Sequence, residues 1–248
     1  MSQDHLRPDG EAIGLAPERC GSRRGSELAP PERELYRWIL RRFAAASPPS
    51  VSDVERAAAE QGIAAGAALR RMEEVDLVHR RPDGTIWCAY PFSAQPTGHT
   101  VELEGGQPPL HAMCAIDALG IPLMLRRGAV VRCAEPTTGR ELVIRIDPTG
   151  ESRSEPAGPV ALIARTLGEG PLASSCCPLI NLFGSRRLAE EFLGGRPDLT
   201  GAVLSLTDAV ILARAVFEGV LDDPPPEWPV SPPASPGPSS RSRRDRRS

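Results

Sequence analysis

"AVVRCAEPTTGRELVIRID", residues 129–147, is the stretch that decides the fold class. Two apolar runs flank a Pro-Thr-Thr-Gly segment at 136–139, and this arrangement predicts a β-hairpin. Further apolar stretches predict strands at 99–105, 158–166, 178–183 and 201–206. A chain that contains hairpins is not built only from β-α-β units.

Helices are expected between these strands. Residues 112–125 look helical until Pro122, and residues 185–195 form a helix with Ser185 as its N-cap. A closing helix at 207–221 begins with Thr207 or Asp208 as its cap. Hairpins mixed with helices favour an α+β fold over a doubly wound parallel sheet.

The segment before this core predicts a small helical domain. Helical patterns cover 30–46, 52–62 and 64–78, and the second opens with Ser52 and Glu55 in a capping-box pattern. A Pro-Asp-Gly turn at 82–84 then separates two short strands. Three helices followed by a hairpin predict a winged helix-turn-helix.

Composition divides the chain into four parts. Residues 1–30 are polar and rich in Gly and Pro, and 223–248 form a Pro/Ser/Arg-rich tail, so we expect both to be disordered. Between them we expect the winged-helix domain at 31–90 and an α+β core at 91–222.

Charge argues against nucleic acid as a partner. The chain has no lysine and a net charge of −3, and because its last eight residues carry +4, the rest carries −7. The expected recognition helix carries Arg70 and Arg71, but the acidic Glu73, Glu74 and Asp76 lie beside them. An acidic body repels a phosphate backbone.

The sequence also predicts where the protein works. The first twenty residues contain no apolar h-region, and the longest apolar stretch, 112–125, is too short to span a bilayer. We therefore expect a cytoplasmic protein without membrane contact, in which the six cysteines are mostly reduced thiols. No heptad pattern is present, so we expect a monomer.

Cys114 and Asp117 form the first candidate site. If this stretch is helical, the spacing of three places both side chains on one face. A position in the first turn would favour the thiolate of Cys114 through the helix dipole. An aspartate among Ala, Ile and Leu should have a pKa raised by desolvation, which suits a group that picks up and returns a proton.

The adjacent Cys176 and Cys177 form the second candidate site. Pro178 favours an extended conformation at Cys177, and in a strand only one of the two side chains would face Cys114.

Other interpretations of the thiols stay open at this level. Free cysteines are commonly buried as small apolar side chains, and we read Cys88 and Cys133 in that way. A zinc site through His111 lacks a C-x-x-C pair. No local motif pairs His79 or His99 with a nucleophilic cysteine as in papain-like enzymes.

The two cysteine motifs together resemble the organomercurial (alkylmercury) lyases of bacterial mercury resistance. "MCAIDALGIPLML" and "SSCCPLINLF" carry the resemblance, supported by "VVRCAEPTTG" and "AEEFLGGRPDLTGAVLSLTDAV". It covers about residues 33–221. It implies a winged helix before a small α+β catalytic core and activity without a bound cofactor.

The resemblance also implies site residues. It places the catalytic cysteines at Cys114 and Cys176, the catalytic aspartate at Asp117, and a structural cysteine at Cys133. The two catalytic thiols would bind the mercury of substrate and product, with Asp117 as a further candidate ligand, because thiolates are the softest protein ligands for Hg(II).

The implied reaction is protonolysis of the carbon–mercury bond to a hydrocarbon and Hg(II). Cellular thiols or a mercuric reductase would then accept the metal. One alternative is a thiol-based protein that binds or senses a soft metal and reads DNA through its winged helix. A second is a lyase-like protein that acts on a different substrate. Asp117 separates a lyase from a binding protein, because binding alone needs no proton donor.

Overall fold

The computed structural model describes residues 24–166 and 172–222. The predicted tail at 223–248, and residues 1–23 of the predicted N-terminal extension, lie outside the described residues. Residues 24–30 of that extension are packed rather than loose. Leu28 is buried in the core, and Arg24 pairs with Asp76 at 2.6 Å.

The N-terminal part contains the three expected helices and the hairpin. They are α2 (Pro30–Ala44), α3 (Val51–Glu60), α4 (Ala65–Glu74), β1 (Val78–Arg80) and β2 (Ile86–Ala89). The capping box of α3 is formed by Ser50 and Asp53, not by Ser52 and Glu55. Ser50 accepts a hydrogen bond from the backbone N–H of Asp53, so the helix begins two residues earlier than the sequence pattern predicts.

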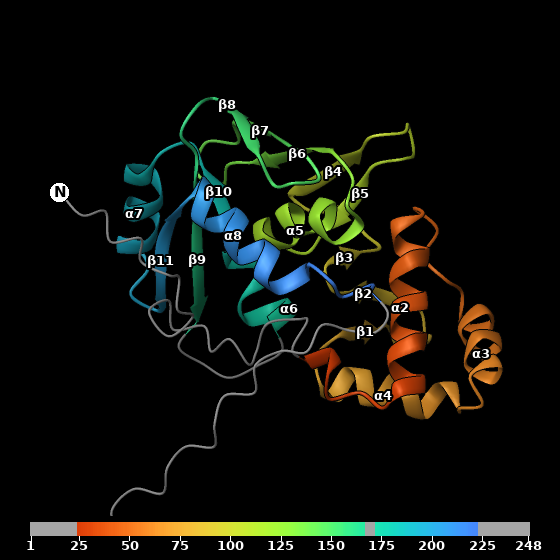
Figure 1. Cartoon of the computed structure of the whole chain (residues 1–248). Coiled ribbons are helices and arrows are strands. Elements are labelled where there is room, and N and C mark those ends of the chain that lie inside the picture. The colour runs from red at the N-terminus through yellow and green to blue at the C-terminus, as the bar shows by residue number, and fades with distance from the viewer. Residues whose placement is uncertain (1–23, 167–171, 223–248) are drawn as a thin grey trace, which may run out of the picture.

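An eight-stranded antiparallel sheet runs through most of the molecule (Figure 1). Its order is β1-β2-β3-β5-β4-β6-β7-β8. The strands after the hairpin are β3 (Phe92–Ser93), β4 (His99–Leu103), β5 (Leu110–Ala112), β6 (Ala129–Ala134), β7 (Glu141–Ile146) and β8 (Ser152–Glu155). The hairpin predicted at 129–147 is confirmed as β6 and β7. Because β3 pairs with both β2 and β5, the N-terminal hairpin and the core share one sheet.

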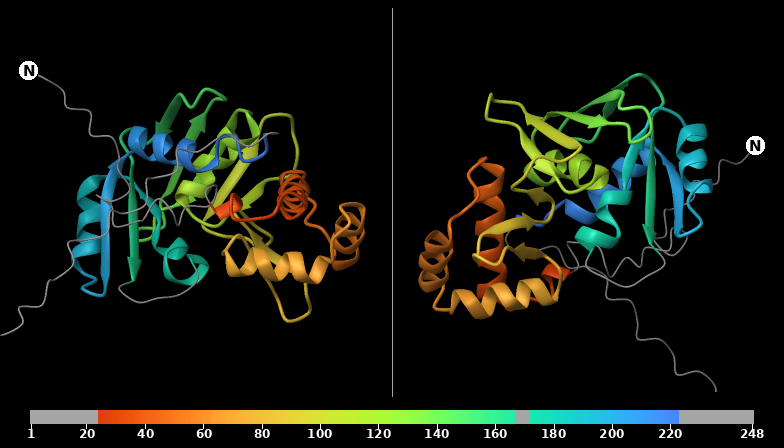
Figure 2. Two further views of the ribbon diagram at one scale, coloured as in Figure 1. Left: turned by 60° about the horizontal axis from the view of Figure 1, so that its bottom comes forward. Right: turned by 180° about the vertical axis from the view of Figure 1, so that it is seen from behind.

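A second, three-stranded sheet lies at the opposite end from α2, α3 and α4 (Figures 1 and 2). Its order is β10-β9-β11, with β9 at Val160–Thr166, β10 at Asn181–Phe183 and β11 at Leu199–Ser205. Helix α7 (Arg186–Gly194) covers it, and Ser185 is its N-cap as predicted. Two antiparallel sheets with helices confirm the α+β class.

Two central helices lie between the ends of the molecule and pack against each other (Figure 2). Helix α5 (Ala115–Leu125) is buried over almost its whole length, and α8 (Leu206–Phe217) is capped by Ser205 rather than by Thr207 or Asp208. The sequence pattern predicts that helix α5 ends at Pro122, and this prediction is wrong. The helix continues to Leu125, because burial against the surrounding core compensates for the N–H that proline lacks.

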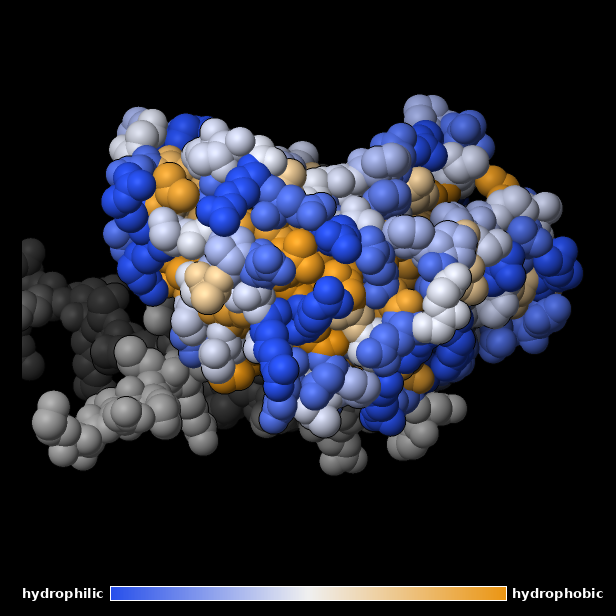
Figure 3. Space-filling view, turned by 90° about the horizontal axis from the view of Figure 1, so that it is seen from above, coloured by the Kyte–Doolittle hydropathy of each residue, from blue (hydrophilic) through white to orange (hydrophobic). Residues whose placement is uncertain are grey.

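A groove is lined by residues of α8 and of the strands β6, β7 and β8. Apolar atoms gather in the middle of the face seen in Figure 3, flanked by hydrophilic residues. The groove has a volume of about 680 Å³, and Arg145, Arg153, Arg214 and Ile211 are among the residues that line it. Across residues 24–166 and 172–222, no helix has the length and apolar character needed to cross a membrane.

Candidate functional site

The start of α5 brings the first thiol and the carboxyl group together. Cys114 is the N-cap residue, with extended backbone angles of φ −152° and ψ 179°. Its Sγ accepts a hydrogen bond from the backbone N–H of Asp117 at 3.4 Å, the position that a serine hydroxyl commonly takes at a helix start. The cap therefore fixes the spacing of three that the sequence analysis singled out.

The second thiol comes from the segment between β9 and β10, two neighbouring strands of the three-stranded sheet. Residues 172–179 form the short helix α6 (Leu172–Ser175) and the 3-10 helix η3 (Cys177–Leu179), not the extended strand expected around Pro178. Directly after this turn, the carbonyl oxygen of Ile180 accepts a hydrogen bond from the N–H of Ala115 at 3.0 Å. This bond ties the turn to the first residue of α5.

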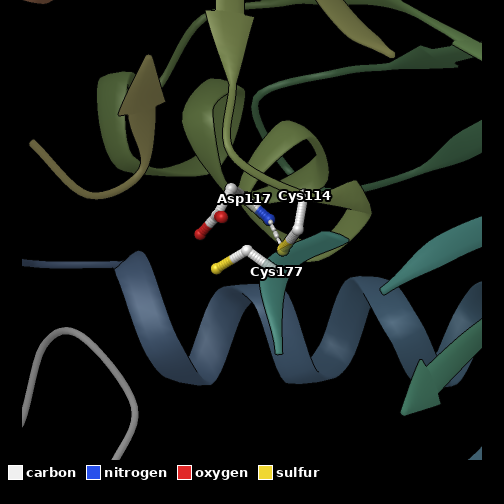
Figure 4. A group of neighbouring side chains, drawn as sticks. All are labelled: Cys114, Asp117 and Cys177. Carbon is white, nitrogen blue, oxygen red and sulfur yellow. Dashed lines mark hydrogen bonds between the residues drawn. The ribbon is translucent and has the colours of Figure 1, made fainter. Parts of the chain in front are cut away.

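Cys114, Asp117 and Cys177 make one compact group (Figure 4). One ligand atom from each residue lies within 4.8 Å of the other two, and all three residues are buried. The side chains of all three converge in Figure 4 although Cys177 comes from a different segment. Two thiols and one carboxyl group form a donor set that suits a soft metal such as mercury.

Burial governs the protonation of this group. It raises the pKa of Asp117 to about 7, as the apolar sequence context predicts, and hydrogen bonds from Cys114 lower it only in part. One carboxyl oxygen, Oδ2, has no hydrogen-bond partner among the described residues. Burial also raises the pKa of the Cys114 thiol, so the thiolate expected at the start of the helix is not favoured. The site therefore holds a thiol that needs a base beside a carboxyl group that can gain or lose a proton near neutrality.

The structure does not bring Cys176 to this group. Its Sγ donates to the carbonyl oxygen of Ala164 on β9 at 3.7 Å. The reason is the conformation of the turn, because Cys176 lies between α6 and η3 with φ −131° and ψ −55°. Only one of the two adjacent thiols faces Cys114, as expected, but that thiol belongs to Cys177.

Tyr90 also reaches the group, although no motif in the sequence points to it. The thiol of Cys177 donates to the Tyr90 hydroxyl at 3.6 Å. Tyr90 follows directly after β2, two residues beyond the fully buried Cys88. Its contact joins segments 87 residues apart, and no local pattern signals such a contact.

The histidines do not enter the site. His99 is buried and its Nδ1 lies 3.1 Å from the Sγ of Cys133, while burial lowers the pKa of His99 to about 4. His79 lies 2.6 Å from Asp76. Within the described residues, no histidine joins a group of three metal-ligating side chains, so a mixed zinc site with His111 is not found there. The thiol that His99 contacts belongs to Cys133, which is not part of the group of Cys114, Asp117 and Cys177.

Comparison with known proteins identifies one family. The family model described as alkylmercury lyase matches residues 92–218. An alkylmercury lyase of Staphylococcus epidermidis is 28% identical over 182 residues, which cover 73% of this chain and 80% of that protein. One of Streptomyces lividans is 26% identical over 219 residues, 88% of this chain and 98% of that protein.

A solved structure shares the fold. The crystal structure of the mercury-bound form of MerB2 superposes with a TM-score of 0.66 at 19% sequence identity, covering 79% of this chain and 94% of that one. Because the family model spans more than half of the sequence and includes Cys114, Asp117 and Cys177, the chain belongs to the alkylmercury lyase family.

Proposed function

We propose that this protein is an organomercurial lyase that cleaves carbon–mercury bonds by protonolysis. One observation carries the proposal: two thiols and a carboxyl group lie within 4.8 Å of one another in a buried site. Membership of the alkylmercury lyase family supports the same substrate class.

The reaction balances with the groups present. The sulfurs of Cys114 and Cys177 bind the mercury of R–Hg⁺ as two S–Hg bonds form and the C–Hg bond breaks. One thiol proton passes through Asp117 to the leaving carbon, giving R–H, and the other leaves to solvent. Hg(II) remains bound by two thiolates, and mercury undergoes no change of oxidation state. We propose that turnover needs no bound cofactor and that free thiols or a mercuric reductase remove the product.

We assign the second catalytic thiol to Cys177 instead of Cys176. The position of the Cys177 side chain beside Cys114 and Asp117 supports this assignment. Cys176, whose thiol is directed to Ala164, would then contribute to the packing of the turn.

The N-terminal part supports a winged-helix arrangement, which we retain as a proposal. Its order of three helices and a β1–β2 hairpin agrees with that motif. Metal sensing with DNA binding is the weaker alternative. Arg71 in the expected recognition helix is paired with Glu74, and Arg80 on β1 is paired with Glu73. Paired arginines have less charge to offer a phosphate backbone.

The test is hydrocarbon release from a phenylmercury salt, measured in the headspace with reduced protein and excess thiol. Cys177→Ser should lower benzene formation by at least a hundredfold, because serine is a poor ligand for mercury. Cys176→Ser is the matched control and should keep more than about half of the wild-type rate. Asp117→Asn should bind Hg(II) and release no benzene. Equal loss in both serine variants would refute the assignment of Cys177, and full activity of Asp117→Asn would refute protonolysis through Asp117.

A further inference from the structure

Tyr90 connects the N-terminal part to the thiol site. It is only 5% exposed, and its hydroxyl lies 3.6 Å from the Sγ of Cys177. Cys177 is a reacting group only if the proposed function is correct, so the role inferred for Tyr90 rests on that proposal. The core motifs alone do not provide this hydroxyl, because Tyr90 lies ahead of residues 92–218 that match the family model.

The position of Tyr90 is fixed from several sides. Its carbonyl oxygen accepts a hydrogen bond from the Tyr36 hydroxyl of α2 at 2.7 Å, and its N–H donates to Leu77 at 3.0 Å. Its ring meets the ring of His79 edge-on, with centroids 5.9 Å apart. Because Tyr90 is already ordered, its hydroxyl can position the Cys177 thiol with little further loss of conformational entropy.

The Tyr90 hydroxyl can form hydrogen bonds with two sulfur atoms. A phenol carries one donor hydrogen and two acceptor sites. It accepts from Cys177, and it also interacts with the thiol of Cys88 two residues earlier. A tyrosine hydroxyl carries its proton at neutral pH. It can therefore accept from a thiol or donate to a thiolate that holds a metal.

We infer that Tyr90 is a positioning residue for the mercury site. Its hydroxyl directs the Cys177 sulfur toward Cys114 and Asp117 and donates to that sulfur when mercury is bound. Outer hydrogen bonds to metal ligands typically change affinity or activity 10- to 100-fold. The N-terminal part would then contribute directly to the retention of Hg(II) instead of only covering the core.

The test uses Hg(II) chloride alone, at one equivalent per reduced chain, so it does not depend on hydrocarbon formation. Loss of Hg(II) to excess dithiothreitol is followed through the mercury–thiolate absorbance. Tyr90→Phe should lose Hg(II) about tenfold faster than the wild type. Ser93→Ala is the control, because it also removes a buried hydroxyl from a hydrogen bond, the one to the carbonyl oxygen of Gln95, and it should stay within about twofold of the wild type.

A second measurement needs no substitution at Tyr90. The chain has two tyrosines, so 3-fluorotyrosine labelling gives two ¹⁹F signals, which Tyr36→Phe assigns. Hg(II) should shift the signal of Tyr90 and leave that of Tyr36 in place. Equal Hg(II) loss from Tyr90→Phe and wild type, equal acceleration by Tyr90→Phe and Ser93→Ala, or an unmoved Tyr90 signal would overturn the inference. Failure of the lyase proposal would appear differently, as absence of benzene from the wild type with the Tyr90 effects intact.

Discussion

Asp117 combines a catalytic position with a cost to stability. It is buried in an apolar helix, one of its oxygens has no partner among the described residues, and its pKa is raised to about 7. A carboxyl group whose pKa is higher in the folded state than in the unfolded chain stabilises the fold most at low pH. That contribution is lost as the pH rises through the folded pKa.

The raised pKa of Asp117 predicts that Asp117→Asn changes how the stability of the protein depends on pH. Between pH 5 and pH 8 the wild type should lose on the order of 2 kcal/mol of stability relative to the variant, whose amide does not ionise. Chemical denaturation at the two pH values measures the difference. A constant difference between the two proteins would show that Asp117 has an ordinary pKa.

The sequence predicts those contacts of the site that are local along the chain, and it does not predict the others. The i to i+3 spacing of Cys114 and Asp117 is local, so a helix start suffices to bring them together. The choice between Cys176 and Cys177 depends on the backbone angles of the turn, and Pro178 is compatible with a 3-10 helix as well as with a strand. Tyr90 depends on a contact between distant segments, which only the tertiary structure reveals.

At the scale of elements, the packing of α5 on α8 supports the site. Gly120 in α5 faces the ring of Phe217 in α8 so closely that an added Cβ would collide with it. Glycine costs stability within a helix, but here it allows the two buried helices to approach. The same dense packing explains why α5 continues past Pro122, where the local pattern predicts its end.

This contact predicts opposite effects for two glycine substitutions. Gly120→Ala should lower the free energy of unfolding by about 1–3 kcal/mol, because the ring of Phe217 has to move. Gly66→Ala in α4 is the matched control, since the nearest atom to its Cβ would be the flexible end of Arg70 at 3.6 Å, and it should be neutral or stabilising by up to about 1 kcal/mol. Urea denaturation measures the free energy of unfolding of both variants. Similar changes in the two variants would argue against tight packing at Gly120.

At the scale of the whole molecule, the sheet joins regions that composition separates. The sequence predicts a division near residue 90, because helical and hairpin patterns change there. Strand pairing is long-range and leaves no such local mark, yet β3 pairs with β2 on one side and with β5 on the other. The expected class and most strands were predictable, but the continuity of the sheet was not.

Continuity of the sheet predicts one unfolding transition. Trp38 and Trp87 report on the N-terminal part, and far-ultraviolet circular dichroism reports on the whole chain. In a Trp228→Phe background, which removes the tryptophan outside the described residues, fluorescence and dichroism should give the same urea midpoint. An earlier fluorescence midpoint would mean that the N-terminal part unfolds on its own.

The most direct test of the central claim is the isotope content of the hydrocarbon released from phenylmercury acetate in D₂O, determined by mass spectrometry. The thiols and the carboxyl group exchange with solvent, so protonolysis at Cys114, Asp117 and Cys177 predicts one molecule of monodeuterated benzene per Hg(II) released. Unlabelled benzene, or mercury release without benzene, would contradict the account.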